Sequence, residues 1–263
     1  MGACERCGGT GFEIVDKDGR EFAAPCACRR GTTRKASFFE ACRVPPRYEH
    51  CTLRSFEPGS DTLLQALRKA ESYCGGYPYV GPDEGLGLLF TGDNGVGKTH
   101  LAVAVLRELW EQKGVRGQFW DFHELIREIR HSYNEETRTT ELQVLEPVVE
   151  TGVLLLDDLG AWKMTEWMLD TLFFILNSRY MSKRATLITS NYPDVSPEQA
   201  GRDGSLRKRE FLVERVGTRL RSRLVEMCLL VKMHGDDHRQ ARQQANEIAV
   251  RSVPPVPGAV RDR

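Results

Sequence analysis

From residue 86 onward, short runs of consecutive apolar residues alternate with longer segments in which apolar residues recur at helical spacing. The short runs predict buried strands, and the spaced segments predict helices. The predicted strands cover residues 86–91, 118–122, 153–157, 185–190 and 228–232, and the predicted helices cover 100–110, 123–133, 165–180 and 211–226. Strands that alternate with helices predict an α/β fold with a parallel sheet flanked by helices.

The chain before residue 86 has a different pattern. Residues 36–42 and 62–74 have the spacing of helices, and prolines or glycines follow each of them. The first 30 residues are rich in Cys and Gly and contain few apolar side chains. We therefore expect four parts, which are a Cys-rich module at 1–35, a helical connector at 36–80, the α/β domain at 81–250 and a Pro-rich, disordered tail at 251–263.

Composition excludes some classes of protein. Of the 263 residues, 37 are Lys or Arg and 37 are Asp or Glu, so the net charge is zero. A neutral chain is not expected to coat polyanions such as DNA along their length. Basic residues nevertheless gather at 29–54 and 202–223, either as phosphate contacts or as solvated helix faces. No apolar run is long enough to span a membrane, and the N-terminus lacks the core of a signal peptide. We expect a cytoplasmic protein without disulfides and without a membrane partner.

The octet at residues 92–99, G-D-N-G-V-G-K-T, matches the phosphate-loop pattern G-x-x-x-x-G-K-[ST] at every defined position. A predicted strand precedes it and a predicted helix follows, which is the required context; the alternative is a glycine turn that happens to precede a helix. In such a loop, backbone N–H groups converge on a polyphosphate, Lys98 reaches the β- and γ-phosphates, and Thr99 holds Mg²⁺. The residues expected to bind the nucleotide here are Gly92, Asp93, Asn94, Gly95, Val96, Gly97, Lys98, Thr99 and His100.

Two carboxylates, Asp157 and Asp158, end the third predicted strand. Open α/β sheets bind ligands at the carboxyl ends of their strands, which places both acids beside the phosphate loop. We expect Asp157 to bind the nucleotide's Mg²⁺ together with Thr99, and Asp158 to polarise an attacking water. Asn191 follows the fourth predicted strand and either orients that water or contacts the γ-phosphate, although a turn-forming Asn explains it equally well.

These motifs together resemble those of the AAA+ superfamily of P-loop NTPases, and within it the DnaC/DnaI helicase loaders and IstB transposition helpers. The segment at 214–224 resembles the one that carries the family's arginine finger, and G-D-D-H-R at 235–239 resembles its sensor-2 signature. The resemblance implies an AAA+ fold, ATP and Mg²⁺ as cofactors, and ATP hydrolysis. It assigns Asn191 to sensor 1, Arg223 to the finger and Arg239 to sensor 2.

The chain departs from the family pattern at three places. The second acid after the third strand is Asp158, where AAA+ enzymes often have Glu, which implies slow hydrolysis that depends on assembly or DNA. His238 stands where the family has an aromatic residue. Arg219, Arg221 and Arg223 are crowded together, so that Arg219 is a second candidate for the finger.

The resemblance implies a DNA-replication accessory ATPase. Its partners would be the replicative DNA helicase, single-stranded DNA and further copies of itself, since an arginine finger that acts on a neighbour's ATP requires a homo-oligomer. An IstB-like transposition helper, which binds duplex DNA and a transposase, is the alternative interpretation. A small P-loop metabolite kinase is a third, less favoured one.

Four cysteines near the N-terminus, Cys4, Cys7, Cys26 and Cys28, have the paired spacing of a tetrahedral Zn²⁺ site. A short segment with few apolar residues needs such a staple to fold, so we expect a structural zinc, the alternative being a reduced, flexible tail. The remaining cysteines, Cys42, Cys51, Cys74 and Cys228, are interpreted as small core or surface residues.

Overall fold

The structure is a computed structural model that describes residues 12–17, 20–25, 37–80, 83–84, 86–133, 140–194 and 210–238. Near the N-terminus, β1 (Phe12–Lys17) and β2 (Arg20–Pro25) pair as antiparallel strands, which the sequence patterns did not predict. The predictions for the zinc ligands, sensor 2 and the tail concern Cys4, Cys7, Cys26, Cys28, Arg239 and 251–263, which lie outside the described residues.

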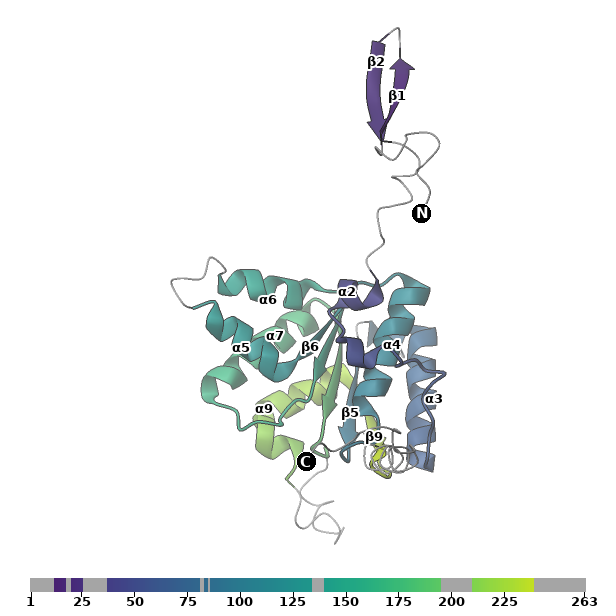
Figure 1. Cartoon of the computed structure of the whole chain (residues 1–263). Helices are drawn as coiled ribbons and strands as arrows, with labels where there is room; N and C mark the ends of the chain where they lie inside the picture. Colours follow the sequence, from purple (N-terminus) through teal and green to yellow (C-terminus); the bar gives the residue numbers. More distant parts are fainter. Residues whose placement is uncertain are drawn as a thin grey trace, which may run out of the picture.

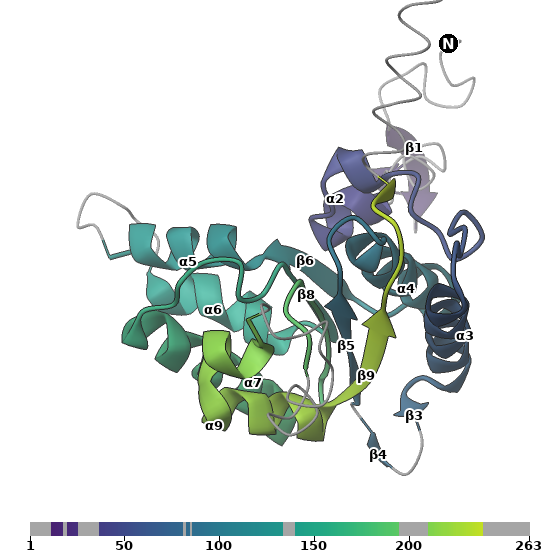
Figure 2. The same cartoon turned by 90° about the horizontal axis from the view of Figure 1, so that it is seen from below.

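A five-stranded sheet in the order β6-β7-β8-β5-β9 forms the centre of the α/β part, and every neighbouring pair is parallel (Figures 1 and 2). Each strand coincides with a predicted one within a residue or two. The strands are β5 (Gly87–Gly92), β6 (Gly117–Asp121), β7 (Val153–Asp157), β8 (Ala185–Ser190) and β9 (Cys228–Met233). Because the strands are parallel, their carboxyl ends meet at one edge of the sheet, where the predicted site residues follow them.

Helices cover both faces of this sheet. Alternate residues of β5 point to opposite faces, so that Leu88 and Phe90 join one apolar cluster and Leu89 joins the other. The first cluster is completed by α2 (Phe38–Cys42), α3 (Asp61–Gly76) and α4 (Lys98–Lys113). The second is completed by α5 (Phe122–His131), α6 (Glu141–Glu150), α7 (Glu166–Met181) and α9 (Leu212–Met227) (Figure 2). This arrangement confirms the predicted α/β class.

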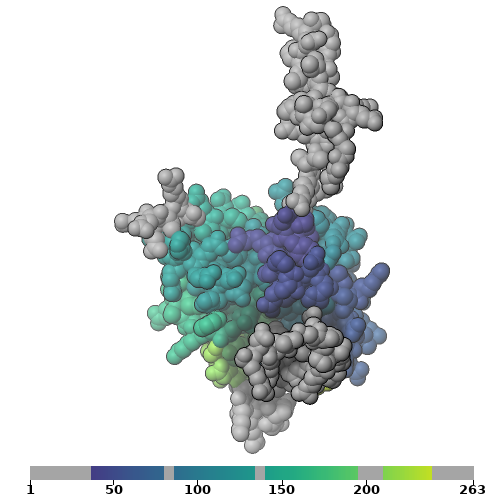
Figure 3. Space-filling model, viewed as in Figure 1, coloured from purple at the N-terminus to yellow at the C-terminus, as the bar shows by residue number. Residues whose placement is uncertain are grey.

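The segment expected to be a connector packs against the sheet domain. Helix α3 contributes Leu63 and Tyr73 to the same apolar cluster as α4, and the Tyr73 hydroxyl donates to the carbonyl of Leu86 at 2.8 Å. Figure 3 shows the purple and blue chain after residue 37 spread over one face of the molecule. The described part of this segment therefore belongs to the packed core, whereas the division of the whole chain into domains stays a prediction.

Helix α6 was not among the predicted helices. It contains Pro147, which removes a backbone donor and makes an apolar segment difficult to assign from its pattern. A capping box stabilises the start of this helix. The Thr140 hydroxyl accepts from the N–H of Gln143, and the Gln143 side chain accepts from the N–H of Thr140. Among the described residues, no helix is both long enough and apolar enough to cross a membrane.

Arg179 is a charged residue at the centre of the fold, with none of its surface exposed. Its guanidinium donates to the carbonyls of Val148 (3.0 Å) and Thr151 (2.7 Å) at the end of α6, and to the carbonyl of Ala185 (2.5 Å) at the start of β8. The last carbonyls of a helix have no partner within the helix, so Arg179 satisfies them and ties α6 and α7 to the sheet. Burial lowers the pKa of Arg179 to about 9, and the side chain remains charged at neutral pH.

We expect Arg179→Met to lower the free energy of unfolding by about 3 kcal/mol, because the substitution leaves several buried carbonyls without a donor. Chemical denaturation measures this change. Arg127→Met, on the exposed face of α5, is the matched control and changes the free energy by about 0.5 kcal/mol or less. Equal stability of the two variants would show that Arg179 does not hold the helices to the sheet.

Candidate nucleotide-binding site

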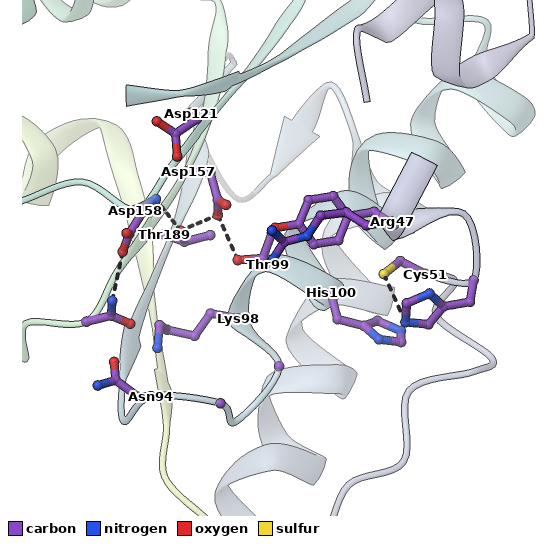
Figure 4. Close-up of a pocket in the computed structure, with 15 residues that line it drawn as sticks. Arg47, Cys51, Asn94, Lys98, Thr99, His100, Asp121, Asp157, Asp158 and Thr189 are labelled. Carbon is purple, nitrogen blue, oxygen red and sulfur yellow. Dashed lines mark hydrogen bonds between the residues drawn. The ribbon is translucent and has the colours of Figure 1, made fainter. Parts of the chain in front are cut away.

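The carboxyl ends of β5, β7 and β8 surround a cavity of about 510 Å³. The phosphate loop follows β5 and Asn191 follows β8. Asp157 is the last residue of β7, and Asp158 comes directly after it. Figure 4 shows Lys98 and Thr99 of the loop facing Asp157 and Asp158 across a common space. The predicted residues that line this cavity are Asn94, Gly95, Gly97, Lys98, Thr99, His100, Asp157, Asp158 and Asn191.

Two glycines shape the phosphate loop. Gly95 and Gly97 have φ values of 74° and 94°, which side chains rarely adopt, and Gly97 immediately precedes α4. A Cβ atom on Gly97 would stand 2.8 Å from the Phe56 ring, and one on Gly95 would collide with the carboxylate of Asp237. Only glycine fits both positions, and the loop aims the amino end of α4 at the cavity.

Lys98 begins α4 and lies 6% exposed at the base of the loop. Its ammonium donates to the carbonyls of Gly92 (3.1 Å) and Asp93 (2.5 Å), which hold it across the loop. A phosphate in the cavity would offer stronger, charged acceptors to the same ammonium. The position of Lys98 thus fits its predicted role as the main cation for the β- and γ-phosphates.

Asp157 is a buried carboxylate that two hydroxyls contact. Thr99 donates to its Oδ1 at 2.8 Å and Thr189 donates to the same atom at 2.6 Å. Burial raises the pKa of Asp157 above its usual range, while the hydrogen bonds from Thr189 and Thr99 partly oppose this rise. A buried carboxylate of this kind gains most from a cation, and its oxygens together with the Thr99 hydroxyl are the ligands that Mg²⁺ prefers.

Asp158 and Asn191 form a second polar pair at the edge of the cavity. The Asn191 amide donates to Oδ1 of Asp158 at 2.7 Å, and the backbone N–H of Asp158 donates to the Thr189 hydroxyl at 2.9 Å. Asp158 adopts a left-handed backbone conformation with φ of 59°, a strained state for a residue other than glycine. The pair lines the cavity, and the roles expected for Asp158 and Asn191 in hydrolysis stay predictions.

Other predicted residues lie outside the cavity. Val96 is a buried apolar residue of the core, and Oδ2 of Asp93 accepts a hydrogen bond from Nδ1 of His234 at 3.2 Å. Arg223 pairs with Glu226 at 2.9 Å, and its guanidinium lies 4.2 Å from the centre of the Tyr180 ring. Within one chain, therefore, the structure does not bring Arg223 to the phosphate loop.

Several residues of the site were missed by the sequence analysis. Thr189 connects Asp157 with the backbone of Asp158, and Arg47 and Asp121 line the cavity. Thr189 lies within an apolar strand, where a hydroxyl gives no signal until the neighbouring strand is known. Arg47 comes from the chain before α3, far from the motif in sequence.

Arg215 of α9 was also missed. Its guanidinium donates to the carbonyls of Gly160 (2.8 Å) and Ala161 (3.1 Å), just after Asp158, and lies over the ring of Tyr192, just after Asn191. Arg215 thus connects α9 to both loops that carry the polar pair of the cavity.

The cysteines Cys42, Cys51, Cys74 and Cys228, which were expected to be core or surface residues, are all buried. Cys51 also lines the cavity, next to His50 and His100. Burial raises the pKa of Cys51 to about 11, so its thiol is neutral at physiological pH, and burial lowers the pKa of His100.

The residues present fit a magnesium–nucleoside triphosphate. The cavity has the volume of a small-molecule site, glycines leave room where side chains would fill the loop, and a buried carboxylate lies within reach of a threonine hydroxyl. Comparison with known proteins supports this fit, because the model of the IstB-like ATP-binding proteins matches residues 79–246. The chain belongs to this family.

Relatives of this IstB-like protein include helicase loaders and insertion-sequence proteins. It is 29% identical to the replicative helicase loader DnaI of Bacillus subtilis over 72% of this chain and 58% of that protein. It is 33% identical to a protein of Pseudomonas aeruginosa named as an ATP-binding protein of insertion sequence IS21, over 52% of this chain and 47% of that protein. The matches thus span only about half of these curated relatives.

Solved structures confirm the AAA+ fold. A crystal structure of the DnaC helicase loader superimposes with a TM-score of 0.60 and 32% identity, over 72% of this chain and 100% of that chain. A crystal structure of DnaI superimposes with a TM-score of 0.55 and 25% identity, over 74% of this chain and 93% of that chain.

We expect Lys98→Ala to weaken binding of a fluorescent ATP analogue by about 30- to 100-fold, because the phosphates lose a charged donor worth about 2–3 kcal/mol. Titration by fluorescence anisotropy measures the dissociation constant. Lys113→Ala, at the other end of the same helix, is the matched control and leaves the constant unchanged. Unchanged binding by Lys98→Ala would place the nucleotide elsewhere.

Proposed function

We propose that this protein is a cytoplasmic ATPase that loads a replicative helicase onto single-stranded DNA. The observation that carries the proposal is the likeness to the DnaC loader crystal structure, which extends over the whole of that chain. Membership of an ATP-binding family and the geometry of Lys98, Thr99 and Asp157 support ATP as the ligand.

Five residues of the cavity have a part in the proposed hydrolysis. Lys98 exchanges its two backbone carbonyls for phosphate oxygens, while Thr99 and Asp157 hold Mg²⁺, which polarises the phosphoryl oxygens when it is bound. Asp158 accepts a hydrogen bond from the attacking water, and Asn191 fixes the orientation of the Asp158 carboxylate. The shorter side chain of Asp, compared with Glu, agrees with slow turnover.

Single-stranded DNA is supported by exposed aromatic side chains on the segment that follows Asp158 and at the end of α5. Trp162, which is 59% exposed, stacks on His123 with ring centres 4.7 Å apart. Tyr133, which is 50% exposed, meets the edge of Trp167, and Arg130 lies over the Trp167 ring at 5.4 Å. Aromatic rings with neighbouring cations bind single strands by stacking on their bases.

The IstB-like transposition helper is the second candidate, because the matching family model bears that name and the insertion-sequence relative is 33% identical. The two candidates share the ATP site and differ in their DNA and protein partners. Family membership gives no support to the metabolite kinase.

We propose that an arginine of α9 completes the ATP site of a neighbouring copy in a homo-oligomer. The contacts distinguish the three candidates. Arg221 forms an ion pair with the buried Asp194, and Arg223 pairs with Glu226, whereas Arg219 is exposed and lies over the Phe173 ring at 3.7 Å. Arg219 can therefore reach a neighbour without breaking an ion pair seen in the described residues, which favours it over the predicted Arg223.

We expect Trp162→Ala to weaken binding of a single-stranded oligonucleotide by about tenfold, the cost of one lost stacking contact. Tyr79→Ala, which removes another exposed ring elsewhere on the surface, is the control and leaves binding unchanged. Fluorescence anisotropy measures both, and an affinity pull-down of the host's replicative helicase, with and without ATP, tests the partner. Preference for duplex DNA together with no capture of the helicase would favour the transposition helper.

We expect Arg219→Ala to lower DNA-stimulated ATP hydrolysis at least about tenfold while nucleotide affinity is kept. Mixing it with Asp158→Ala should restore part of the rate, because each protein supplies what the other lacks. Arg223→Ala is the comparison variant. If Arg223→Ala loses activity and is rescued while Arg219→Ala is normal, Arg223 is the finger; no rescue of either variant would contradict a finger that acts on a neighbour.

A further inference from the structure

Three side chains with metal-binding atoms converge on one wall of the cavity, opposite the carboxylates (Figure 4). They are His50, Cys51 and His100, and one ligand atom from each lies within 4.8 Å of the other two. The Cys51 sulfur is 3.9 Å from Nε2 of His50, and the two imidazole rings have centres 5.6 Å apart. In the part of the chain that the structure describes, no other group of His, Cys, Asp or Glu meets the same criterion.

The chemistry of this donor set differs from that of the magnesium ligands. One thiolate and two imidazoles suit Zn²⁺ and other borderline-soft ions, whereas Mg²⁺ takes oxygen ligands. Ligand atoms around a tetrahedral ion lie about 3.3–3.8 Å apart, since each is about 2.0–2.3 Å from the metal. The observed sulfur-to-nitrogen separation of 3.9 Å is slightly longer than this spacing, so a small movement of the side chains brings both atoms to an ion.

The surroundings of His100 provide the outer hydrogen bonds that metal-binding histidines require. Its Nε2 lies 3.1 Å from the carbonyl of Thr52 and 3.3 Å from the hydroxyl of Ser55. When Nε2 donates to that carbonyl, Nδ1 is left with a free lone pair, which is the form of imidazole that binds a metal.

We propose that His50, Cys51 and His100 form a transition-metal site, with zinc as the expected ion, in the wall of the ATP cavity. The site is separate from the predicted N-terminal zinc module and from the magnesium position at Thr99, and it does not rest on the proposed function. The metal joins the loop before α3 to the first turn of α4, one residue after Thr99. Three protein ligands leave a fourth coordination position open to the cavity.

The test is a Co²⁺ titration of the full-length chain carrying Cys4→Ser, Cys7→Ser, Cys26→Ser and Cys28→Ser, which removes the predicted N-terminal ligands. We expect about one Co²⁺ per chain, with the intense visible absorption of tetrahedral cobalt and a thiolate-to-cobalt band, both lost when Zn²⁺ is added. Absence of a bound ion in this protein would overturn the proposal.

Two variants in the same background assign the ligands. Cys51→Ser should abolish the thiolate-to-cobalt band, and His50→Asn should weaken binding by at least about tenfold. His50 is exposed, so its replacement tests the site without disturbing the core, and circular dichroism checks the fold of each variant. Cys74→Ser, at a buried cysteine of α3, is the matched control and keeps both the ion and the band. Unchanged binding by both Cys51→Ser and His50→Asn would overturn the proposal.

Discussion

A single carboxylate oxygen, Oδ1 of Asp157, joins three elements of the nucleotide site. It accepts from Thr99 at the start of α4 and from Thr189 in β8, while Asp157 itself ends β7. Because the carboxyl group is buried, its charge is stable only where donors and a cation surround it. The phosphate loop, the central strand and the neighbouring strand are therefore aligned by the same group that is expected to need Mg²⁺.

Those parts of the fold that depend on local pattern were predictable from the sequence. All five strands of the sheet follow from short runs of apolar residues. The inner strands β5, β7 and β8 are buried along their whole length and have no polar side to interrupt the run, whereas the edge strand β9 has exposed positions. The phosphate loop is contiguous in sequence, and its glycines are required by the backbone itself. Asp157, Asp158 and Asn191 were predictable because each directly follows or ends such a strand.

Contacts between distant segments were not predictable in this way. Thr189 accepts from the backbone N–H of Asp158, and Arg215 donates to the loop after Asp158. Each contact joins residues that are more than twenty positions apart in the sequence, and neither residue belongs to a recognisable motif. Arg179 satisfies the end of α6, a helix whose proline hid it from the pattern. The choice among the candidate arginines of α9 depends on their ion-pair partners, and the pairing of Arg221 with Asp194 appears only when α9 is packed beside the end of β8.

Helix α9 is divided by Gly217, whose backbone (φ 78°, ψ 163°) is not helical. The first part, Leu212–Val216, carries Arg215 and is tied to the carbonyls that follow Asp158. The second part places Arg219 and Arg223 against rings of α7, while Arg221 pairs with Asp194 after β8. A glycine at the junction adopts the positive φ that this break in the helix requires. Because of the break, one helix contacts the loops that follow Asp158 and Asn191 through Arg215 and packs along α7 through its second part.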